Sequence, residues 1–462
     1  MKKGIDLTEG NILPKIIGLT LPIVGTSFVQ MAYNLTDVIW LGRTGSATVT
    51  AVTTAGFFMW LLLSIFYCTK AGTETLVSQA VGRKDFKTAR QVSENALTFA
   101  ICCSIILNLT VLVSSGVLLK FFKLEPEVMG HALAYLRIVS FGMFFAVINP
   151  TFSAIYIGFG NSRTPFVVSS MGLVLNIILD PILIFGWGAI PALGAKGAAL
   201  ATVVLNILVF SVFLFKLKSD SSVLERFKLF APIDKKILKK LLDIGIPVTI
   251  HQVAFCLISM YIGRIVSGFG TIPLGVQNVG ASIEALSWNT ALGFSTALGT
   301  FTGQNYGALK LDRIRKGYYI VLFLSLSLGG LATIGFYFFG SQIFSVFTSE
   351  SVMRSTGALY LKILAVSQMF MCLEIISAGG FYGLGRTRPP SLTSVLFTGL
   401  RIPAALAVVS FTTWGVAGVW WCISISSVVK GIIVSSWYML ELNALPTLNV
   451  GSPANRLRPE EG

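Results

Sequence analysis

Four acidic residues lie inside long apolar stretches of this chain, where a charged side chain is costly. They are Asp37, Asp180, Glu284 and Glu374. An ionised side chain at the centre of a bilayer costs about 2.5–3.5 kcal/mol on insertion scales, so each acid needs a partner or a function. Carboxylates held away from water can bind small cations, take up protons or attract cationic ligands. The chemistry that these residues offer is therefore reversible ion binding.

A polar stripe accompanies the first of these acids. Thr26, Gln30, Asn34 and Asp37 recur at intervals of three or four residues. They therefore share one face of a helix, and this face must be turned towards protein rather than lipid. We expect Gln30 and Asn34 to contact a bound substrate. Pro22, earlier on the same helix, removes a backbone hydrogen bond, which a spanning helix can accept as a tolerated kink.

A second helix and a third bring oxygen atoms to the same depth. Asn176 and Asp180 are four residues apart and share a helix face. With a rise of 1.5 Å per residue, Asp37, Asp180 and Thr202 lie about 9–12 Å below the outer ends of their spans. The sequence thus predicts a cation or proton site at Asp37, Asn176, Asp180 and Thr202, with H⁺ or Na⁺ bound at the two aspartates. The alternative is that these groups only satisfy one another, as a buried hydrogen-bonded network with a structural role.

The second half of the chain offers groups that suit a bulky organic cation. Glu284 and Trp288 are one helical turn apart, and Met371 precedes Glu374 by three residues. An acid beside an aromatic ring and a flexible thioether can hold such a cation through charge, cation–π contact and adaptable packing. We therefore expect these four residues to bind substrate. The alternative is that Glu374 or Glu284 neutralises Arg401, which lies in the middle of a span.

The elements that position these residues are membrane-spanning helices. Of the 462 residues, 54% are hydrophobic and 12% are charged, whereas a soluble domain has about 25% charged residues. A spanning helix needs about 20 apolar residues. The sequence predicts twelve such spans near residues 14–42, 48–80, 91–119, 131–158, 163–187, 194–216, 239–268, 272–304, 316–340, 353–383, 389–412 and 414–440.

The basic residues lie mainly on one side of these spans. Loops on the side of the amino terminus carry 24 Lys and Arg residues, and loops on the other side carry eight. Because cytoplasmic loops are enriched in Lys and Arg, this asymmetry predicts that both termini are cytoplasmic in a multi-pass protein of the cell inner membrane. It also explains the net charge of +15 without a nucleic-acid partner.

The two halves of the chain are related at a constant offset of 225 residues. Pro22 corresponds to Pro247, and the turn 158–165 corresponds to the turn 383–390. Gln79, Gly82 and Arg90 correspond in the same way to Gln304, Gly307 and Arg315. Six spans per half give a parallel repeat about an axis along the membrane normal. We expect an all-α fold with a first lobe at 1–216, a connector at 217–238, a second lobe at 239–442 and a polar tail at 443–462.

These features resemble the multidrug and toxic compound extrusion (MATE) family. The resemblance rests on two six-helix halves, paired Gly-x-Gly-x-x-Arg turns, Gln-x-x-Gly loops, and Asp37 with Asn176-x-x-x-Asp180-Pro181. It implies two lobes in a V and antiport of drugs against H⁺ or Na⁺. It also implies that Asp37, Asn176, Asp180 and Thr202 form the cation network of the prokaryotic branch. In that branch the first helix is proposed to bend at the position of Pro22, which makes this residue the candidate hinge. The seventh span lacks the acid that another branch carries there.

The resulting hypothesis is secondary active efflux of organic cations by a monomer in the lipid bilayer. No Walker A pattern occurs in the sequence, so we expect coupling to an H⁺ or Na⁺ gradient without a cofactor. A flippase for lipid-linked sugars or other amphiphiles is the alternative. A membrane-embedded enzyme is disfavoured because His251 has no evident nucleophile or metal cluster near it in the sequence.

Overall fold

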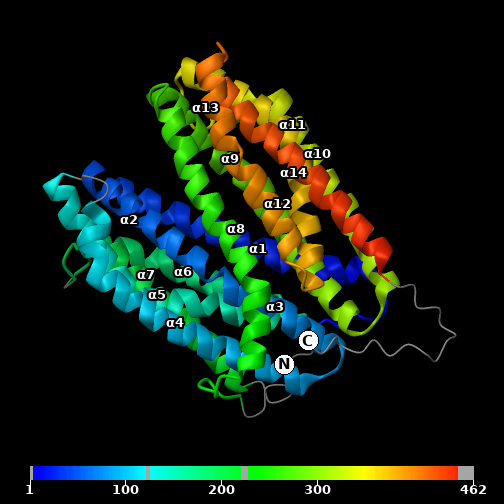
Figure 1. Cartoon of the computed structure of the whole chain (residues 1–462). Helices are drawn as coiled ribbons and strands as arrows, with labels where there is room; N and C mark the ends of the chain where they lie inside the picture. The colour runs from blue at the N-terminus through cyan, green and yellow to red at the C-terminus, as the bar shows by residue number, and fades with distance from the viewer. Residues whose placement is uncertain (1–3, 121–124, 189, 220–226, 446–462) are drawn as a thin grey trace, which may run out of the picture.

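The computed structural model describes residues 4–120, 125–188, 190–219 and 227–445 (Figure 1). Within these ranges the chain consists of helices and loops, and its only β contact is a bridge between Trp187 and Ile190. The predicted all-α fold is confirmed. Residues 220–226 of the predicted connector and residues 446–462 of the predicted tail lie outside the described residues.

In the described part of the first half, the chain forms seven helices. They are α1 (Ile12–Gly42), α2 (Ser46–Ile65), α3 (Tyr67–Gly82), α4 (Phe86–Lys120), α5 (Pro126–Gly158), α6 (Arg163–Phe185) and α7 (Ala195–Ser219). The second half, as far as it is described, adds another seven. They are α8 (Lys235–Ser267), α9 (Thr271–Gly307), α10 (Leu311–Ser345), α11 (Ser351–Gly383), α12 (Arg388–Gly399), α13 (Arg401–Phe411) and α14 (Gly415–Ala444).

These helices correspond to the twelve predicted spans, because α2 with α3 and α12 with α13 each make up one span. In the described ranges, eleven stretches are long and apolar enough to cross a membrane. The remaining span is α9, which is 37 residues long but carries polar residues such as Gln277, Asn278 and Glu284. Polar side chains along a spanning helix must face protein or a water-filled space.

Two spans are interrupted where the sequence predicts continuous helices. The break between α12 and α13 falls at Leu400. Pro403 follows by three residues, lacks a backbone N–H and clashes with the carbonyl of Gly399, which explains why the helix stops there. The break between α2 and α3 falls at Phe66, where no proline accounts for it.

The helices form two bundles that meet at one end and diverge towards the other, in a V (Figure 1). At the boundary, α3 packs against α8 and α9, and α1 packs against α9. The predicted arrangement of two helical lobes in a V is therefore confirmed.

Helix α1 passes from one bundle to the other. Its first half buries Leu19 among residues of α9, α10, α11 and α14, and its last turn buries Leu41 in the core of the first bundle. Val24 lies against Gly293 of α9 at the crossing. Pro22 is close to this point, yet α1 runs through it as a continuous helix. The predicted hinge at Pro22 therefore lies inside an unbroken helix in this conformation.

The bundles are joined by a reciprocal pair of hydrogen bonds. Nε2 of Gln79, on α3, donates to the carbonyl of Gly383 at 2.9 Å. Nε2 of Gln304, on α9, donates to the carbonyl of Gly158 at 3.0 Å. Each residue of the first bond is related to a residue of the second by the internal repeat. The repeated loop and turn motifs of the sequence therefore meet across the boundary.

Two glycines allow this close approach. A Cβ on Gly82 would overlap the backbone carbonyl of Gln304, and a Cβ on Gly307 would overlap that of Gln79. Since backbone atoms cannot move aside as flexible side chains can, neither position accepts a larger residue while the bundles are in contact.

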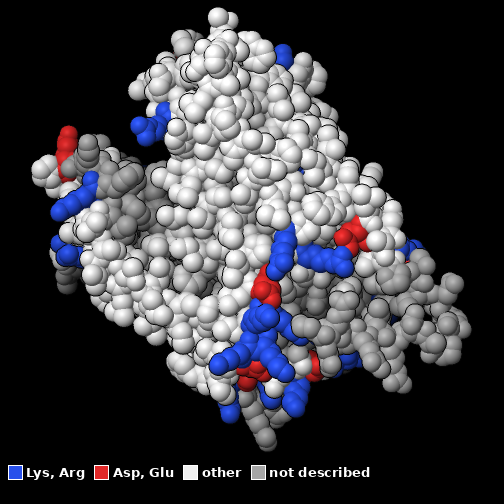
Figure 2. Space-filling view, viewed as in Figure 1, with Lys and Arg blue, Asp and Glu red and all other residues white. Residues whose placement is uncertain are grey.

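Lys and Arg gather at the end of the molecule where the bundles meet (Figure 2). Exposed Arg83, Lys84 and Lys87 lie around the α3–α4 turn, and four exposed lysines lie in residues 235–240 at the start of α8. The visible faces of the helices above them carry few charges (Figure 2). This is the distribution expected of a protein with a basic cytoplasmic end and an apolar belt.

Candidate functional site

The predicted ion site is assembled from α1 and α6. Nδ2 of Asn176 donates a hydrogen bond to Oδ1 of Asp37 at 3.0 Å. Asp180 lies one turn after Asn176 on α6, and its carboxyl group is a direct electrostatic neighbour of that of Asp37. The structure thus brings together three of the four residues predicted for this site.

The polar atoms of this cluster are buried and only partly satisfied. The side chains of Asn176 and Asp180 are 0% and 1% exposed. Oδ1 of Asn176 and both carboxylate oxygens of Asp180 accept no hydrogen bond from the described residues. A buried polar group without a partner costs about 1–3 kcal/mol, and more when it is charged. The site therefore has oxygen atoms without partners in the described structure, of the kind that bind a proton or a hard cation.

Thr202 joins this cluster through a tyrosine. Its Oγ1 accepts a hydrogen bond from the Tyr33 hydroxyl at 3.3 Å and donates one to the carbonyl of Ala198 at 3.0 Å. Tyr33 precedes Asp37 by one turn and lies within electrostatic range of it. Thr202 is therefore linked to the site by its hydrogen bond to Tyr33, and its role as an ion ligand stays a prediction.

Two tyrosines beside the aspartates were missed by the sequence reasoning. Tyr33 and Tyr135 each lie within electrostatic range of both Asp37 and Asp180. Tyr33 has a sequence signal, because it is four residues before Asp37 and so shares its helix face. Tyr135 is on α5 and has no such signal, since tertiary packing alone brings that helix to the site.

The other members of the polar stripe do not join the cluster. Oγ1 of Thr26 donates to the carbonyl of Pro22 on its own helix at 2.9 Å. Gln30 and Asn34 are exposed, and no hydrogen bond links them to Asp37 within the described residues. Both side chains are accessible, and their contact with a substrate stays a prediction.

In the second bundle, Glu374 is engaged in a buried ion pair. Its Oε2 lies 3.1 Å from Nζ of Lys430, and its Oε1 accepts a hydrogen bond from Ser394 at 2.7 Å. Glu374 and Lys430 are 7% and 4% exposed. The alternative that Arg401 neutralises Glu374 therefore named the wrong partner. The two residues of the pair are on α11 and α14, so no local spacing in the sequence points to it.

Arg401 is buried among hydroxyl groups. Its guanidinium donates to Oγ of Ser426 and, at 2.9 Å, to Oγ of Ser427. Glu284 and Glu374 lie within electrostatic range of it without a direct contact in the described structure. The acids therefore offset the charge of Arg401 at a distance rather than as bonded partners.

Glu284 is half-buried and its carboxylate is oriented by an amide. Oε1 of Glu284 accepts a hydrogen bond from Nε2 of Gln368 at 3.0 Å, and the hydroxyl of Ser287 donates to Oε1 of the same amide at 2.9 Å. Trp288 and Met371 are both partly accessible. Of the two predicted acids in this bundle, Glu284 is thus the one without a bonded cation.

A family model described as MatE matches residues 22–182 and, a second time, residues 247–407. The two matches begin 225 residues apart, which is the offset of the internal repeat. Among characterised sequences, the probable multidrug resistance protein NorM of Thermotoga maritima is 26% identical over 417 residues, which cover 88% of each chain. The probable multidrug resistance protein YoeA of Bacillus subtilis is 26% identical over 423 residues, or 90% of this chain and 91% of the relative.

Solved structures share the fold over nearly the full length. A crystal structure of MATE in the straight conformation has a TM-score of 0.88 at 24% identity, over 96% of this chain and 99% of that one. A multidrug resistance MATE family transporter in an outward-facing conformation has a TM-score of 0.89 at 24% identity, with the same coverage. At 24% identity, this structural similarity shows that the chain shares the two-bundle fold of these proteins.

Proposed function

Because this chain belongs to the MatE family, we propose that it is a secondary active exporter of organic cations. Export is coupled to entry of H⁺ or Na⁺ through alternating access. Transport by a two-lobed membrane protein requires a site whose occupancy changes the balance between two conformations. The relatives named as multidrug resistance proteins support the cargo class.

The observation that carries the proposal is the cluster of Asp37, Asn176 and Asp180. Asn176 and Asp180 are buried in the first bundle and Asp37 is half-buried beside them, and oxygen atoms of Asn176 and Asp180 lack hydrogen-bond partners among the described residues. A proton or Na⁺ at this point would satisfy them and remove the repulsion between two neighbouring carboxylates. Binding would therefore alter the packing of α1 against α6. Since α1 also packs in the second bundle, it can pass this change to the boundary.

In the proposed cycle the present conformation is the one closed at the basic end. We propose that this end is cytoplasmic, that both termini lie on that side and that the protein works as a monomer in the plasma membrane. Export then requires the reciprocal contacts of Gln79 and Gln304 to open so that cargo can enter. Ion binding at the aspartates would accompany the return to the conformation that is closed at the basic end.

The substrate is proposed to lie between the bundles. Gln30 and Asn34 are accessible on α1, and Glu284 with Trp288 and Met371 is accessible in the second bundle. Glu284 supplies the negative charge for a cationic drug, because Lys430 already neutralises Glu374.

The driving force depends on the stoichiometry of the exchange. If one H⁺ enters as one monovalent drug leaves, the charges cancel and a pH unit supplies about 1.4 kcal/mol, or tenfold accumulation. If two protons enter, the membrane potential adds about 2.3 kcal/mol per 100 mV.

The proposal is tested with purified protein in liposomes that contain ethidium. We expect a pH gradient or a Na⁺ gradient, imposed separately, to drive ethidium transport. Asp37→Asn should abolish this transport while the protein still folds, because the change is nearly isosteric and removes the titrating charge. Asp312→Asn, at a 76% exposed side chain on α10, is the matched control and should transport normally. Undiminished gradient-driven transport by Asp37→Asn would reject the coupling role.

A further inference from the structure

The internal repeat relates the ion site of the first bundle to a defined position in the second. Each residue of the site has a counterpart 225 residues later in the chain. The counterparts are Ile262 for Asp37, Arg401 for Asn176, Ala405 for Asp180, Ser427 for Thr202 and Tyr360 for Tyr135. The helices that carry them are also packed alike, since α13 packs against α8 and α14 as α6 packs against α1 and α7. The two positions can therefore be compared side chain by side chain.

At the counterpart position both carboxylates are replaced by apolar side chains. Ile262 and Ala405 are 3% and 0% exposed, and they belong to one buried hydrophobic cluster with Val266 and Val419. Aliphatic side chains offer no ligand to a cation. The second bundle therefore lacks the two acids that make the site of the first bundle anionic.

A guanidinium group takes the place of the amide of Asn176. Arg401 is 8% exposed and donates a hydrogen bond to Oγ of Ser427, the counterpart of Thr202, at 2.9 Å. Tyr360 lies within electrostatic range of Arg401, as its counterpart Tyr135 does of the two aspartates. The hydroxyl groups of the first site are thus kept in the second bundle, and the charged group that they accompany is a cation fixed to the chain.

The charge of Arg401 is balanced within the second bundle. Glu284 and Glu374 lie within electrostatic range of its guanidinium, and Glu374 is already paired with Lys430 at 3.1 Å. Glu284 is therefore the acid that offsets Arg401. The counterparts in the first bundle are Met59 for Glu284, Asn149 for Glu374 and Leu205 for Lys430. None of these three is charged, so no side chain at these positions offsets Asp37 and Asp180.

We propose that Arg401 is a resident cation. Its guanidinium does permanently in the second bundle what an exchangeable H⁺ or Na⁺ does at Asp37 and Asp180 in the first, so this inference rests on the proposed ion coupling. Because a guanidinium group is always charged and cannot leave the chain, the second bundle keeps its cation-bound packing throughout the cycle. Ion binding then changes the packing of α1 against α6 only. One ion site, rather than two sites related by the repeat, drives the exchange.

Variants at Arg401 separate its charge from its hydrogen bonds. Arg401→Lys keeps the positive charge, whereas Arg401→Gln keeps a polar donor without the charge. We expect Arg401→Gln to lower the melting temperature of the detergent-solubilised protein more than Arg401→Lys does, because loss of the cation leaves Glu284 uncompensated. An equal or larger decrease with Arg401→Lys would show that Arg401 acts through its hydrogen bonds and would overturn the proposal.

A soluble cation should refill the position in Arg401→Ala, which removes the guanidinium group. We expect millimolar guanidinium chloride to restore most of the lost melting temperature with a saturable dose dependence. Urea is the matched control ligand, because it has nearly the same shape and is neutral, and it should restore nothing. Wild type and Arg264→Ala, at an exposed arginine in the last turn of α8, should respond to neither compound. Equal effects of guanidinium and urea on Arg401→Ala, or no effect of either, would contradict a resident cation.

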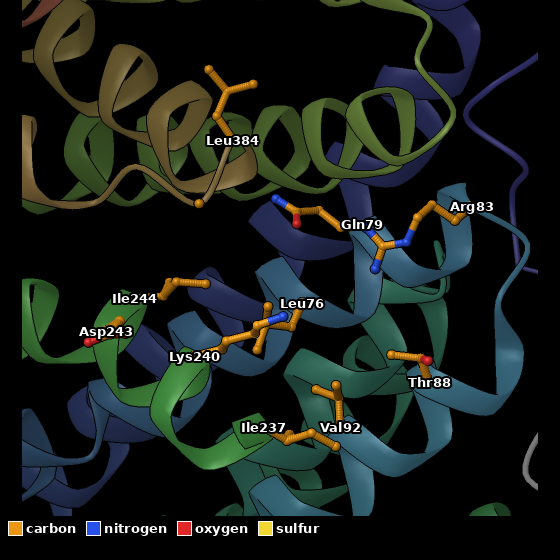
Figure 3. A pocket seen from close by; sticks show the side chains of 11 residues that line it. Leu76, Gln79, Arg83, Thr88, Val92, Ile237, Lys240, Asp243, Ile244 and Leu384 are labelled. Atoms are coloured by element: carbon orange, nitrogen blue, oxygen red, sulfur yellow. The ribbon is translucent and has the colours of Figure 1, made fainter. Parts of the chain in front are cut away.

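A second anionic position for the guanidinium ion is a cavity of about 400 Å³ between the bundles at their closed end (Figure 3). The exposed carboxylate of Asp243 lies in its wall, together with Gln79 and Lys240. If the ion binds in place of Arg401, the rescue should be unchanged in Arg401→Ala/Asp243→Asn. Loss of the rescue in this double variant would locate the ion in the cavity and reject the proposal.

The outcome is separable from that of the proposed ion coupling. The melting experiments use neither cargo nor an ion gradient. Asp37→Asn should abolish gradient-driven transport but leave the guanidinium rescue intact when it is combined with Arg401→Ala. Undiminished transport by Asp37→Asn would reject the ion coupling, whereas absence of the rescue with coupling intact would reject the resident cation alone.

Discussion

Gln79 and Gln304 make the same hydrogen bond in opposite directions across the boundary between the bundles. Each amide donates to a carbonyl at the end of a helix of the opposite bundle, and the two pairs are related by the 225-residue repeat. The symmetry is incomplete, because Gln304 also accepts a hydrogen bond from the backbone amide of Leu7, in the segment before α1. The contact at Gln304 should therefore contribute more to closure than the contact at Gln79.

Replacement of either glutamine should favour opening at the basic end. A lost hydrogen bond costs about 1 kcal/mol, or about fivefold in the equilibrium between closed and open forms. We expect about this shift for Gln79→Ala and a larger one for Gln304→Ala. Spin labels on Lys87→Cys and Lys316→Cys, both exposed near this end, would report the distribution of distances between the two bundles.

The control for this experiment is Gln342→Ala, an exposed glutamine at the far end of α10, which should leave the distribution unchanged. Equal shifts for Gln79→Ala and Gln304→Ala would show that the hydrogen bond between Leu7 and Gln304 adds nothing to closure.

A methyl group on Gly82 should separate the bundles. Its Cβ would overlap the Gln304 carbonyl, which is backbone and cannot move aside. We therefore expect Gly82→Ala to depopulate the closed form in the same spin-label measurement. Gly116→Ala is the matched control, since its Cβ would meet nothing within 4 Å, and it should leave the closed form intact. If Gly82→Ala left the population of the closed form unchanged, the close packing of Gly82 against the Gln304 carbonyl would be contradicted.

Neutralising Asp180 should raise thermal stability while it removes ion coupling. Both carboxylate oxygens lack partners among the described residues, and an amide is less costly to bury than a carboxylate. We expect Asp180→Asn to increase the melting temperature of the detergent-solubilised protein and to abolish gradient-driven transport. A lower melting temperature would indicate that the Asp180 carboxylate stabilises the fold as part of a buried hydrogen-bonded network.

Removal of Lys430 should destabilise the second bundle. Lys430→Met leaves Glu374 buried without its cation, and breaking a buried pair in this way costs about 3–5 kcal/mol. The double variant Glu374→Gln/Lys430→Met should recover much of this loss, because no charge remains unpaired. Denaturation in mild detergent measures the free energy of unfolding of the single variant and of the double variant.

Asp312→Ala serves as the comparison, since its pair with Arg315 is largely exposed on the Asp side and should contribute less than about 1 kcal/mol. If Lys430→Met behaved like Asp312→Ala, the Glu374–Lys430 pair would not be a structural ion pair.

The sequence by itself determined the helical class, the twelve spans and the repeat. Hydrophobic length and composition set these features, because a bilayer admits few other structures. Helical spacing also placed Asn176 and Asp180 on one face, and depth counting placed Asp37 at their level. These predictions depend on one helix at a time, so a sequence is sufficient for them.

Only the tertiary structure decided which side chains meet between helices. Three contacts join segments far apart in the chain: Lys430 with Glu374, Tyr135 with the aspartates, and Leu7 with Gln304. Such contacts depend on how each helix is rotated and tilted against its neighbours, and helix periodicity carries no information on that. The sequence therefore sets which residues each helix presents, and packing between the helices selects their partners.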